Sequence, residues 1–333
     1  MIRFGTIGTG WITGAFIDGS LLREHLRLTA VCSRDREKGA AFAGNYGSPQ
    51  VFTDPAEMAA SDSIDAVYIA SPNRLHGEQA KLFLEHGKHV ICEKPIAITP
   101  DELCALQRLA KEKSLVYMEA IMMMHLPARQ ALKAAVGQIG RVTTAHLDFS
   151  QLSSKYPAYL AGQTPNIFNP AFCTGSLMDL GIYCVYPALD LFGLPEEVSA
   201  QAGFLSTGAD GWGSAALRYP DKLVTLTWSK VGQSRAASQI LGDEGSVAIG
   251  SVSCLTNITR YDKNGAPYPV WGDETKAALM GFEGESFYQF IKDPDGSRAA
   301  YEEASKLALH VSRVMAEIRE KAGIRFTVEE GTR

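Results

Sequence analysis

The sequence contains no apolar run that approaches the ~20 residues of a membrane-spanning helix. It has no basic leader either, because the first apolar segment begins at Ile2, so we expect no export signal and a cytoplasmic protein. Lys and Arg do not gather into basic clusters, and the formal net charge is −5. We therefore expect neither a nucleic acid nor a membrane as a partner.

The cysteines form no recognisable metal-binding or disulfide pattern. There are six, at positions 32, 92, 104, 173, 184 and 254, with no C-x-x-C and no Cys/His pair at zinc spacing. We therefore expect no metal site, and we expect the thiols to be small buried side chains in a reducing compartment.

What the chain does contain is typical of a globular α/β protein with two domains. Its 333 residues exceed what one ordinary core serves, and 46% of them are hydrophobic against 21% charged. In the first half, apolar strands alternate with helices, and strands are expected at 2–7, 28–32, 64–70, 88–92 and 115–120. This alternation predicts a doubly wound parallel sheet.

The glycine turn after the first strand is the first candidate site. Gly8-Thr9-Gly10-Trp11-Ile12-Thr13 follows the pattern G-x-G-x-x-G, with Thr13 at the third glycine position. Gly8 permits a tight turn, Gly10 lets the backbone approach a pyrophosphate, and the next helix offers unpaired N–H groups to the anion. Glycine pairs also occur in ordinary turns, but the strand before and the helix after favour a dinucleotide site.

The end of the second strand indicates which dinucleotide binds. Ser33, Arg34 and Asp35 lie about twenty residues past the glycines, where an acidic residue would hold the ribose 2′-hydroxyl of NAD. The serine and the permanently charged guanidinium instead suit the 2′-phosphate of NADP. We therefore expect NADP. NAD is the alternative, if Arg34 faces solvent and Asp35 takes the ribose.

Two further strand ends carry polar residues. Ser71-Pro72-Asn73 and then His76 follow the strand at 64–70, and Glu93-Lys94-Pro95 follows the strand at 88–92. Open α/β sheets bind ligands at these ends, where loss of solvation lets a lysine amine exchange protons near neutral pH. The alternatives are a surface loop with a salt-bridged lysine and a histidine that caps or packs.

The second half changes character after Gly140. A strand at 142–149 leads to an aperiodic loop at 153–174, and a largely apolar helix follows from 175 to 193. Asp179 and Tyr183 are four residues apart on one face of that helix, and an acid in so apolar a helix needs a partner or a function. A buried bond that stiffens the helix is the alternative.

The remaining sequence predicts a sheet and two helices. From Val198 to Val270, apolar and polar residues alternate between turn signals, which indicates an antiparallel meander with one buried face. Helices are expected at about 281–292 and at 298–322, and a last strand at 324–328. Because the other face of the sheet needs a cover, we expect a homo-oligomer, a dimer or a tetramer, packed sheet to sheet.

Taken in order, several of these motifs resemble one known family. The glycine turn, Ser71-Pro72-Asn73 with His76, Glu93-Lys94-Pro95, Met118-Glu119-Ala120 and Asp179-Leu180-Gly181-Ile182-Tyr183 are similar to those of the glucose–fructose oxidoreductase / inositol dehydrogenase / rhizopine-catabolism (Gfo/Idh/MocA) family. The likeness spans nearly the whole chain. Tyr183, where the family often has histidine, resembles the branch of dimeric dihydrodiol and D-xylose dehydrogenases.

The resemblance implies a Rossmann domain at 1–122 that binds NAD(P). It also implies an α+β domain at 123–333, with a largely antiparallel open sheet, that binds substrate and forms the oligomer; the late helices are candidates to pack back on the first domain. The implied cofactor contacts are Gly8, Thr9, Gly10, Trp11, Ile12, Ser33, Arg34, Ser71, Pro72, Asn73, His76, Glu93, Lys94 and Glu119.

The implied reaction moves a hydride between nicotinamide and a secondary hydroxyl or carbonyl of a sugar, polyol or cyclic diol. A base must take the hydroxyl proton as the hydride leaves carbon, and Lys94 and Tyr183 are both candidates. Asp179 would hold one of them in place or bind a second substrate hydroxyl. Two other functions stay open, a non-catalytic NADP-binding regulator and a lyase or hydrolase that uses the dinucleotide as a transient oxidant.

Overall fold

The computed structural model describes residues 1–326, which form two compact units. The first unit combines Met1–His125 with Thr275–Leu309, and the second combines Leu126–Glu274 with the chain from His310 onward. The helix Arg298–Ala322 (α10) contains the second boundary, so each unit draws on two separate stretches of sequence.

The first unit is built on a six-stranded parallel sheet with the strand order β3-β2-β1-β4-β5-β6. Its strands are Ile2–Ile7 (β1), Leu26–Cys32 (β2), Gln50–Phe52 (β3), Ala66–Ile69 (β4), His89–Glu93 (β5) and Tyr117–Ala120 (β6). This is the order of doubly wound sheets that bind dinucleotides, so the predicted fold class is confirmed for this half. The order reverses between β1 and β4, which is where such sheets bind their ligands.

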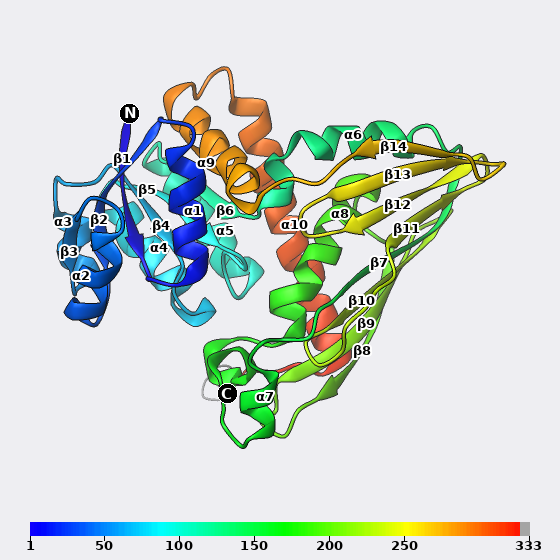
Figure 1. The fold of residues 1–333 in the computed structure, drawn as a ribbon, viewed down its shortest axis with the longest axis horizontal. Helices are drawn as coiled ribbons and strands as arrows, with labels where there is room; N and C mark the ends of the chain where they lie inside the picture. Colours follow the sequence, from blue (N-terminus) through cyan, green and yellow to red (C-terminus); the bar gives the residue numbers. More distant parts are fainter. Residues whose placement is uncertain (327–333) are drawn as a thin grey trace. The chain divides into compact units, whose positions relative to one another are not determined.

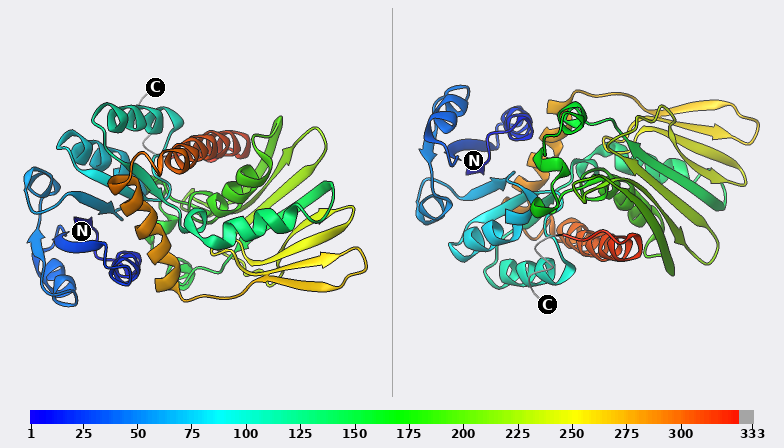
Figure 2. Two further views of the ribbon diagram at one scale, coloured as in Figure 1. Left: turned by 90° about the horizontal axis from the view of Figure 1, so that it is seen from above. Right: turned by 90° about the horizontal axis from the view of Figure 1, so that it is seen from below.

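Helices pack on this sheet from both sides (Figures 1 and 2). They are Trp11–Leu21 (α1), Arg36–Gly44 (α2), Pro55–Ala60 (α3), His76–Glu85 (α4), Pro100–Glu112 (α5) and Lys276–Lys292 (α9). Val67 of β4 lies in one apolar cluster with Phe83 of α4 and Leu103 of α5. Tyr68, the next residue, points to the opposite face, where its ring stacks on Phe16 of α1 at 4.0 Å. Both faces are therefore buried, as a parallel sheet requires.

The late helix α9 belongs to the first unit because it packs closely on α1. A Cβ on Gly19 of α1 would lie 2.7 Å from both Ala277 O and Gly281 N of α9, so a larger residue would force the two helices apart. The helix begins at Lys276, earlier than the expected start near 281. Thr275 caps it, since its hydroxyl accepts a hydrogen bond from Ala278 N–H at 3.3 Å.

The second unit is built on an eight-stranded sheet with the order β14-β13-β12-β11-β7-β10-β9-β8. Its strands are Val142–Ser150 (β7), Glu197–Phe204 (β8), Asp210–Arg218 (β9), Leu223–Ser229 (β10), Ser238–Gly242 (β11), Gly245–Ser251 (β12), Thr256–Asp262 (β13) and Pro267–Trp271 (β14). The largely antiparallel sheet is confirmed, but the simple meander was wrong. The early strand β7 inserts between β11 and β10 and runs parallel to β10, because the long segment 151–196 carries the chain to the far edge.

Helices cover one face of this second sheet. Pro127–Val136 (α6) contacts β12, β13 and β14, whereas Ile182–Phe192 (α8) contacts β7 and β10. Figure 1 shows both helices on the same side, and the opposite face carries no helix in the part of the chain that the structure describes. The loop expected at 153–174 contains one short helix, Tyr156–Leu160 (α7), and isolated 3-10 turns.

The carboxyl-terminal prediction was partly wrong. Residues 324–326, where the last strand was expected to begin, follow α10 without regular structure. The rest of that expected strand lies outside the described residues. Across residues 1–326, no helix is both long enough and apolar enough to cross a membrane.

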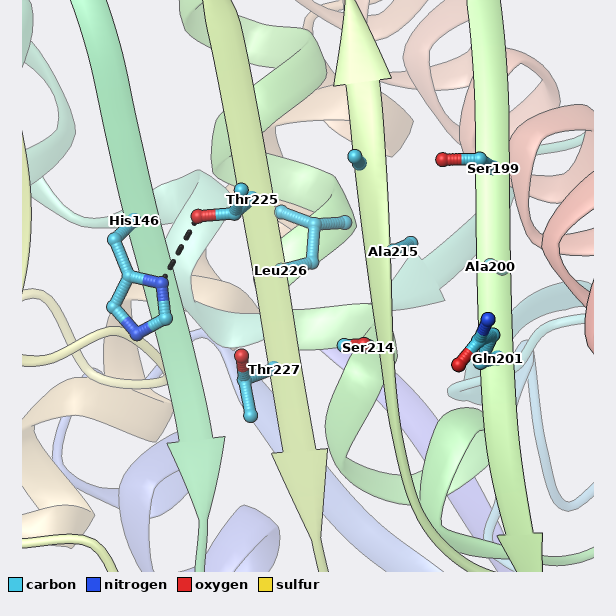
Figure 3. Close-up of a pocket in the computed structure, with 10 residues that line it drawn as sticks. His146, Ser199, Ala200, Gln201, Ser214, Ala215, Thr225, Leu226 and Thr227 are labelled. Atoms are coloured by element: carbon cyan, nitrogen blue, oxygen red, sulfur yellow. Dashed lines mark hydrogen bonds between the residues drawn. The ribbon is translucent and has the colours of Figure 1, made fainter.

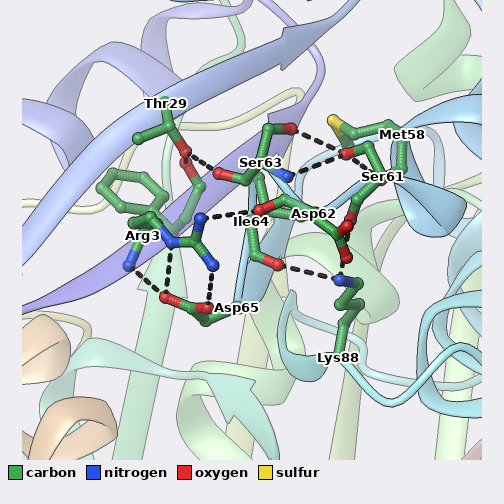
Figure 4. Close-up of polar contacts among 10 residues, drawn as sticks. Arg3, Thr29, Met58, Ser61, Asp62, Ser63, Ile64, Asp65 and Lys88 are labelled. Carbon is green, nitrogen blue, oxygen red and sulfur yellow. Dashed lines mark hydrogen bonds and ion pairs between the residues drawn. The ribbon is translucent and has the colours of Figure 1, made fainter.

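At the amino ends of the parallel strands, a polar network ties β1 to the segment before β4 (Figure 4). The Arg3 guanidinium donates to both oxygens of Asp65, at 3.1 and 2.6 Å. Lys88 Nζ donates to Ser61 O at 2.8 Å and to Ile64 O at 2.9 Å. The Lys88 ammonium thus satisfies two carbonyl oxygens of the segment between α3 and β4, which lies outside the strand ladder.

Lys88→Met should lower the free energy of unfolding by about 2 kcal/mol, because two charge-assisted hydrogen bonds are lost and two carbonyl oxygens lose their donor. Lys81→Met is the control, since Lys81 is exposed and its ion pair with Glu85 should contribute less than about 0.5 kcal/mol. Urea unfolding of both variants measures the difference. Equal losses in the two variants would contradict the role given to Lys88.

Candidate active site

The glycine turn after β1 has the geometry of a phosphate-binding turn. Gly8 has a φ of +104°, and a Cβ there would lie 2.6 Å from Ala70 O, just past β4. Residue 8 must therefore be glycine if the turn is to stay this tight. Gly10 is different, because no atom beyond its chain neighbours lies within 4 Å of the place where its Cβ would stand.

The helix that follows is open to an anion. α1 begins at Trp11, and its N-cap Gly10 makes no side-chain capping bond. Trp11 itself is 76% exposed, so it does not bury the end of the helix. The first N–H groups of α1 and the bare backbone at Gly10 fit the pyrophosphate of a dinucleotide.

Arg34 and Asp35 have different surroundings at the end of β2. The Asp35 carboxylate caps α2, since it accepts hydrogen bonds from Glu37 N–H and Lys38 N–H, each at 3.1 Å. The bond from Lys38 N–H holds the pKa of Asp35 below its ordinary value. Arg34 is exposed and makes no hydrogen bond or ion pair within residues 1–326. Its guanidinium is therefore the group better placed to meet a ligand phosphate.

His76 links the ends of β4 and β5. Its Nδ1 lies 2.8 Å from Pro95 O and its Nε2 lies 2.8 Å from Ser71 O. Burial lowers the pKa of His76, so the ring is neutral and donates to one of these oxygens. Both nitrogens thus face backbone carbonyls, and the ring fixes the two loops against each other. Its contact with the cofactor stays a prediction.

Two carboxyl groups fix the chain on either side of Lys94. Glu93 accepts a hydrogen bond from Tyr68 OH at 2.6 Å, and burial raises its pKa although the Lys94 charge opposes this. Glu119 Oε1 accepts from Ile96 N–H at 2.9 Å. The Lys94–Pro95 peptide between them is cis. The half-buried Lys94 side chain therefore extends from a well-fixed backbone.

The predicted residues of the first unit meet at one edge of its sheet. The glycine turn follows β1, Arg34 follows β2, Ser71-Pro72-Asn73 follows β4, and Glu93-Lys94 ends β5. Ser71 is itself held by a hydrogen bond from its Oγ to Gln79 Oε1 at 2.7 Å. This is the carboxyl edge, where ligands of such sheets bind.

In the second unit, Asp179 and Tyr183 mark the accessible side of an otherwise buried helix. These two residues are half-buried, whereas all the remaining residues from 173 to 189 are buried. The expected continuous helix begins as a π turn, Leu177–Gly181, and continues as α8. Such turns often occur at functional sites. The ring of Tyr183 packs edge to face on the ring of Phe149, with 5.5 Å between the ring centroids.

Sequence reasoning missed Asp210, which holds the start of this π turn. Asp210 of β9 is fully buried, and its Oδ2 accepts from Ser176 Oγ at 2.6 Å and from Leu177 N–H at 2.7 Å. Burial raises the pKa of Asp210, and these bonds oppose that rise. Gly175 leaves room for the carboxylate, since a Cβ there would lie 1.9 Å from Asp210 Oδ1.

Sequence reasoning also missed Lys230, which forms an ion pair with Asp179. A signal was present. Along β10 the buried residues are Val224, Leu226 and Trp228, and Lys230 continues that alternation. The pattern therefore predicts an inward-facing apolar residue at position 230, and the sequence has a lysine there. A charge in the buried phase of a strand needs a partner, and Asp179 is that partner.

Comparison with known proteins agrees with this geometry. Residues 2–121 match an oxidoreductase family with an NAD-binding Rossmann fold, and residues 126–248 match the Gfo/Idh/MocA C-terminal domain. The chain is 38% identical over 330 residues to the scyllo-inositol 2-dehydrogenase (NADP(+)) of Bacillus subtilis, covering 99% of this chain and 100% of that protein. It is 27% identical over 332 residues to the trans-1,2-dihydrobenzene-1,2-diol dehydrogenase of Mus musculus, covering 96% of each.

The fold has solved counterparts as well. A 3-ketoreductase from Actinomadura kijaniata, in complex with NADP and TDP-benzene, has a TM-score of 0.83 to this chain at 20% identity, covering 96% of this chain and 98% of that one. The likeness shows a shared fold across both units. Together with the two family matches it confirms the resemblance seen in the motifs, and the chain belongs to the Gfo/Idh/MocA family of oxidoreductases.

Proposed function

We propose that this protein is an NADP-dependent dehydrogenase that acts on a secondary hydroxyl, or the matching carbonyl, of a cyclic polyol or sugar. The observation that carries the proposal is the pair Asp179 and Tyr183, which present an acid and a phenol from an otherwise buried helix. Its support from comparison is the end-to-end similarity to the NADP-dependent scyllo-inositol dehydrogenase.

The residues of the first unit fit the cofactor. The backbone at Gly10 and the first turn of α1 would hold the pyrophosphate, and the exposed Arg34 would hold the 2′-phosphate through its forked donors. Asp35 is engaged as a helix cap, which favours Arg34 as the ribose-end contact. When bound, the nicotinamide supplies the hydride acceptor or donor.

The chain's own part is to orient the alcohol and to take its proton. A lysine amine held away from bulk water accepts a proton near neutral pH. A nearby cation lowers the pKa of a phenol, and the phenolate that forms can accept a proton as well. We assign the proton to Lys94 or Tyr183, and the orientation of the hydroxyl to the other. Asp179 accepts a hydrogen bond from a second hydroxyl, which a polyol offers and a simple alcohol lacks.

A second copy of the chain is our proposed cover for the open face of the second sheet. A shallow hollow of about 450 Å³ lies on that face, lined among others by His146, Ser199, Gln201, Ser214 and Thr225 (Figure 3). Its lining residues carry no Asp, Glu, Lys or Arg, and His146 Nδ1 lies 3.0 Å from Thr225 Oγ1. A shallow hollow lined by uncharged polar side chains suits the centre of a symmetric interface.

Gly10→Ala should leave the melting temperature near that of the wild type, because Gly10 has a φ of −81° and no neighbour that a Cβ would meet. It should weaken NADPH binding by about tenfold or more, since the methyl group takes the place of the pyrophosphate. Gly8→Ala should instead destabilise the fold by about 1–3 kcal/mol. Thermal unfolding and NADPH fluorescence titration separate the two effects, and wild-type affinity in Gly10→Ala would contradict the assigned site.

Arg34→Gln should raise the Kd for NADPH by about tenfold or more and leave the Kd for NADH unchanged, because a guanidinium binds the 2′-phosphate that NADH lacks. Arg27→Gln, an exposed arginine at the start of β2, serves as the control and should change neither value. An equal loss for both dinucleotides would contradict a 2′-phosphate contact at Arg34. A wild-type preference for NADH would shift the ribose contact to Asp35.

In a scyllo-inositol assay with NADP, followed by nicotinamide absorbance, Lys94→Met and Tyr183→Phe should each lower kcat. The larger loss, about 100-fold or more, identifies the residue that takes the proton, since proton transfer contributes that much in other enzymes. Full turnover in both variants would refute the assignment.

Ser214→Glu should convert the oligomer into monomers, because it would bury two like charges at the proposed interface. Gln163→Glu adds the same charge on an exposed loop and should leave the assembly intact. Light scattering after size exclusion reads the mass of each variant. An unchanged mass in Ser214→Glu would place the interface elsewhere.

A further inference from the structure

Lys230 is buried, and its backbone is fixed from two sides. The residue is 6% exposed. Its N–H donates to Gly211 O of β9 at 2.9 Å, and its carbonyl accepts from Ser153 N–H at 2.9 Å, where the 153–174 loop begins. The strand end and the loop start therefore determine where the amine emerges.

Asp179 is fixed independently of Lys230. Its N–H donates to Gly175 O at 3.2 Å inside the π turn, and Asp210 holds the start of that turn through Ser176 and Leu177. The ion pair joins two elements that are each already ordered. Little conformational freedom is lost when it forms, so the pair can set the direction of the carboxylate.

We propose that Lys230 is a positioning residue for the reaction. It holds the Asp179 carboxylate in the direction in which it accepts a hydrogen bond from a second hydroxyl of the polyol. The inference rests on the proposed function, because it gives Asp179 a role in substrate binding. It predicts that the charge of Lys230 acts through Asp179.

The test compares Lys230→Met, Lys230→Arg, Asp179→Asn and the double variant Lys230→Met/Asp179→Asn in the scyllo-inositol assay with NADP. Lys230→Met should lower kcat/KM by roughly 30-fold or more, with a rise in KM, because the half-buried Asp179 carboxylate loses its cation. Lys230→Arg should recover most of this loss. The double variant should be no worse than Asp179→Asn alone, since the two residues act as one unit.

Two controls separate folding and cofactor effects from positioning. The Kd for NADPH should stay within about twofold of the wild type in every variant, because these residues lie in the second unit. Lys222→Met removes a lysine paired with Asp221 in the same unit, and should leave kcat/KM unchanged. If Lys230→Met does not fold, the double variant is compared with Asp179→Asn: equal kcat/KM supports the proposal, and a further loss overturns it.

Failure of this inference is distinguishable from failure of the proposed function. Wild-type turnover together with a Lys230→Met variant within threefold of wild type, or with additive losses in the double variant, would overturn the role of Lys230 alone. A wild-type protein that binds NADPH but oxidises no polyol would overturn the proposed function, and the role of Lys230 with it.

Discussion

A carboxyl group withdrawn wholly or partly from water must either keep a hydrogen-bond donor or favour its protonated form, and this requirement shapes the candidate site. Asp179 forms an ion pair with Lys230, and Glu119 accepts a hydrogen bond from the N–H of Ile96. Each pairing connects segments far apart in sequence, so it fixes the backbone as well as the charge. Glu283 of α9 shows the other solution: neither of its oxygens has a hydrogen-bond partner within residues 1–326, and burial raises its pKa well above the ordinary value, which favours the uncharged form.

The two units contribute different groups to the proposed function, and each unit holds its own groups in place. The first offers mainly backbone, a bare turn at Gly10 and an uncapped helix end, which suits a charged ligand whose phosphates need many donors. The second offers the side chains of Asp179 and Tyr183, on a helix whose other residues up to 189 are buried and therefore cannot shift easily. Rigid support of this kind is what binding and proton transfer require.

Local patterns were enough to predict much of this. Strand, glycine turn and helix follow one another at the start of the chain. Lys94 directly follows an expected strand, which predicts a position at the ligand-binding edge of the sheet. The spacing of Asp179 and Tyr183 places them on one face of a helix. Pairings between distant segments were not predictable in the same way. The insertion of β7 beside β10, the packing of α9 on Gly19 and the ion pair of Lys230 each depend on tertiary contacts that no local period encodes. Of these three, only the ion pair of Lys230 had a signal in the sequence, because this lysine continues the buried positions of β10.

The most direct test of the account follows the hydride itself. The protein would be incubated with NADP and scyllo-inositol deuterated at its ring carbons, and the nicotinamide analysed by mass spectrometry. We predict reduced cofactor that carries one deuterium for each molecule of inositol oxidised. Consumption of the polyol without net labelled reduced cofactor would indicate a lyase or hydrolase that regenerates its dinucleotide. Cofactor binding without consumption of any polyol would indicate a regulator, and either result would contradict the dehydrogenase.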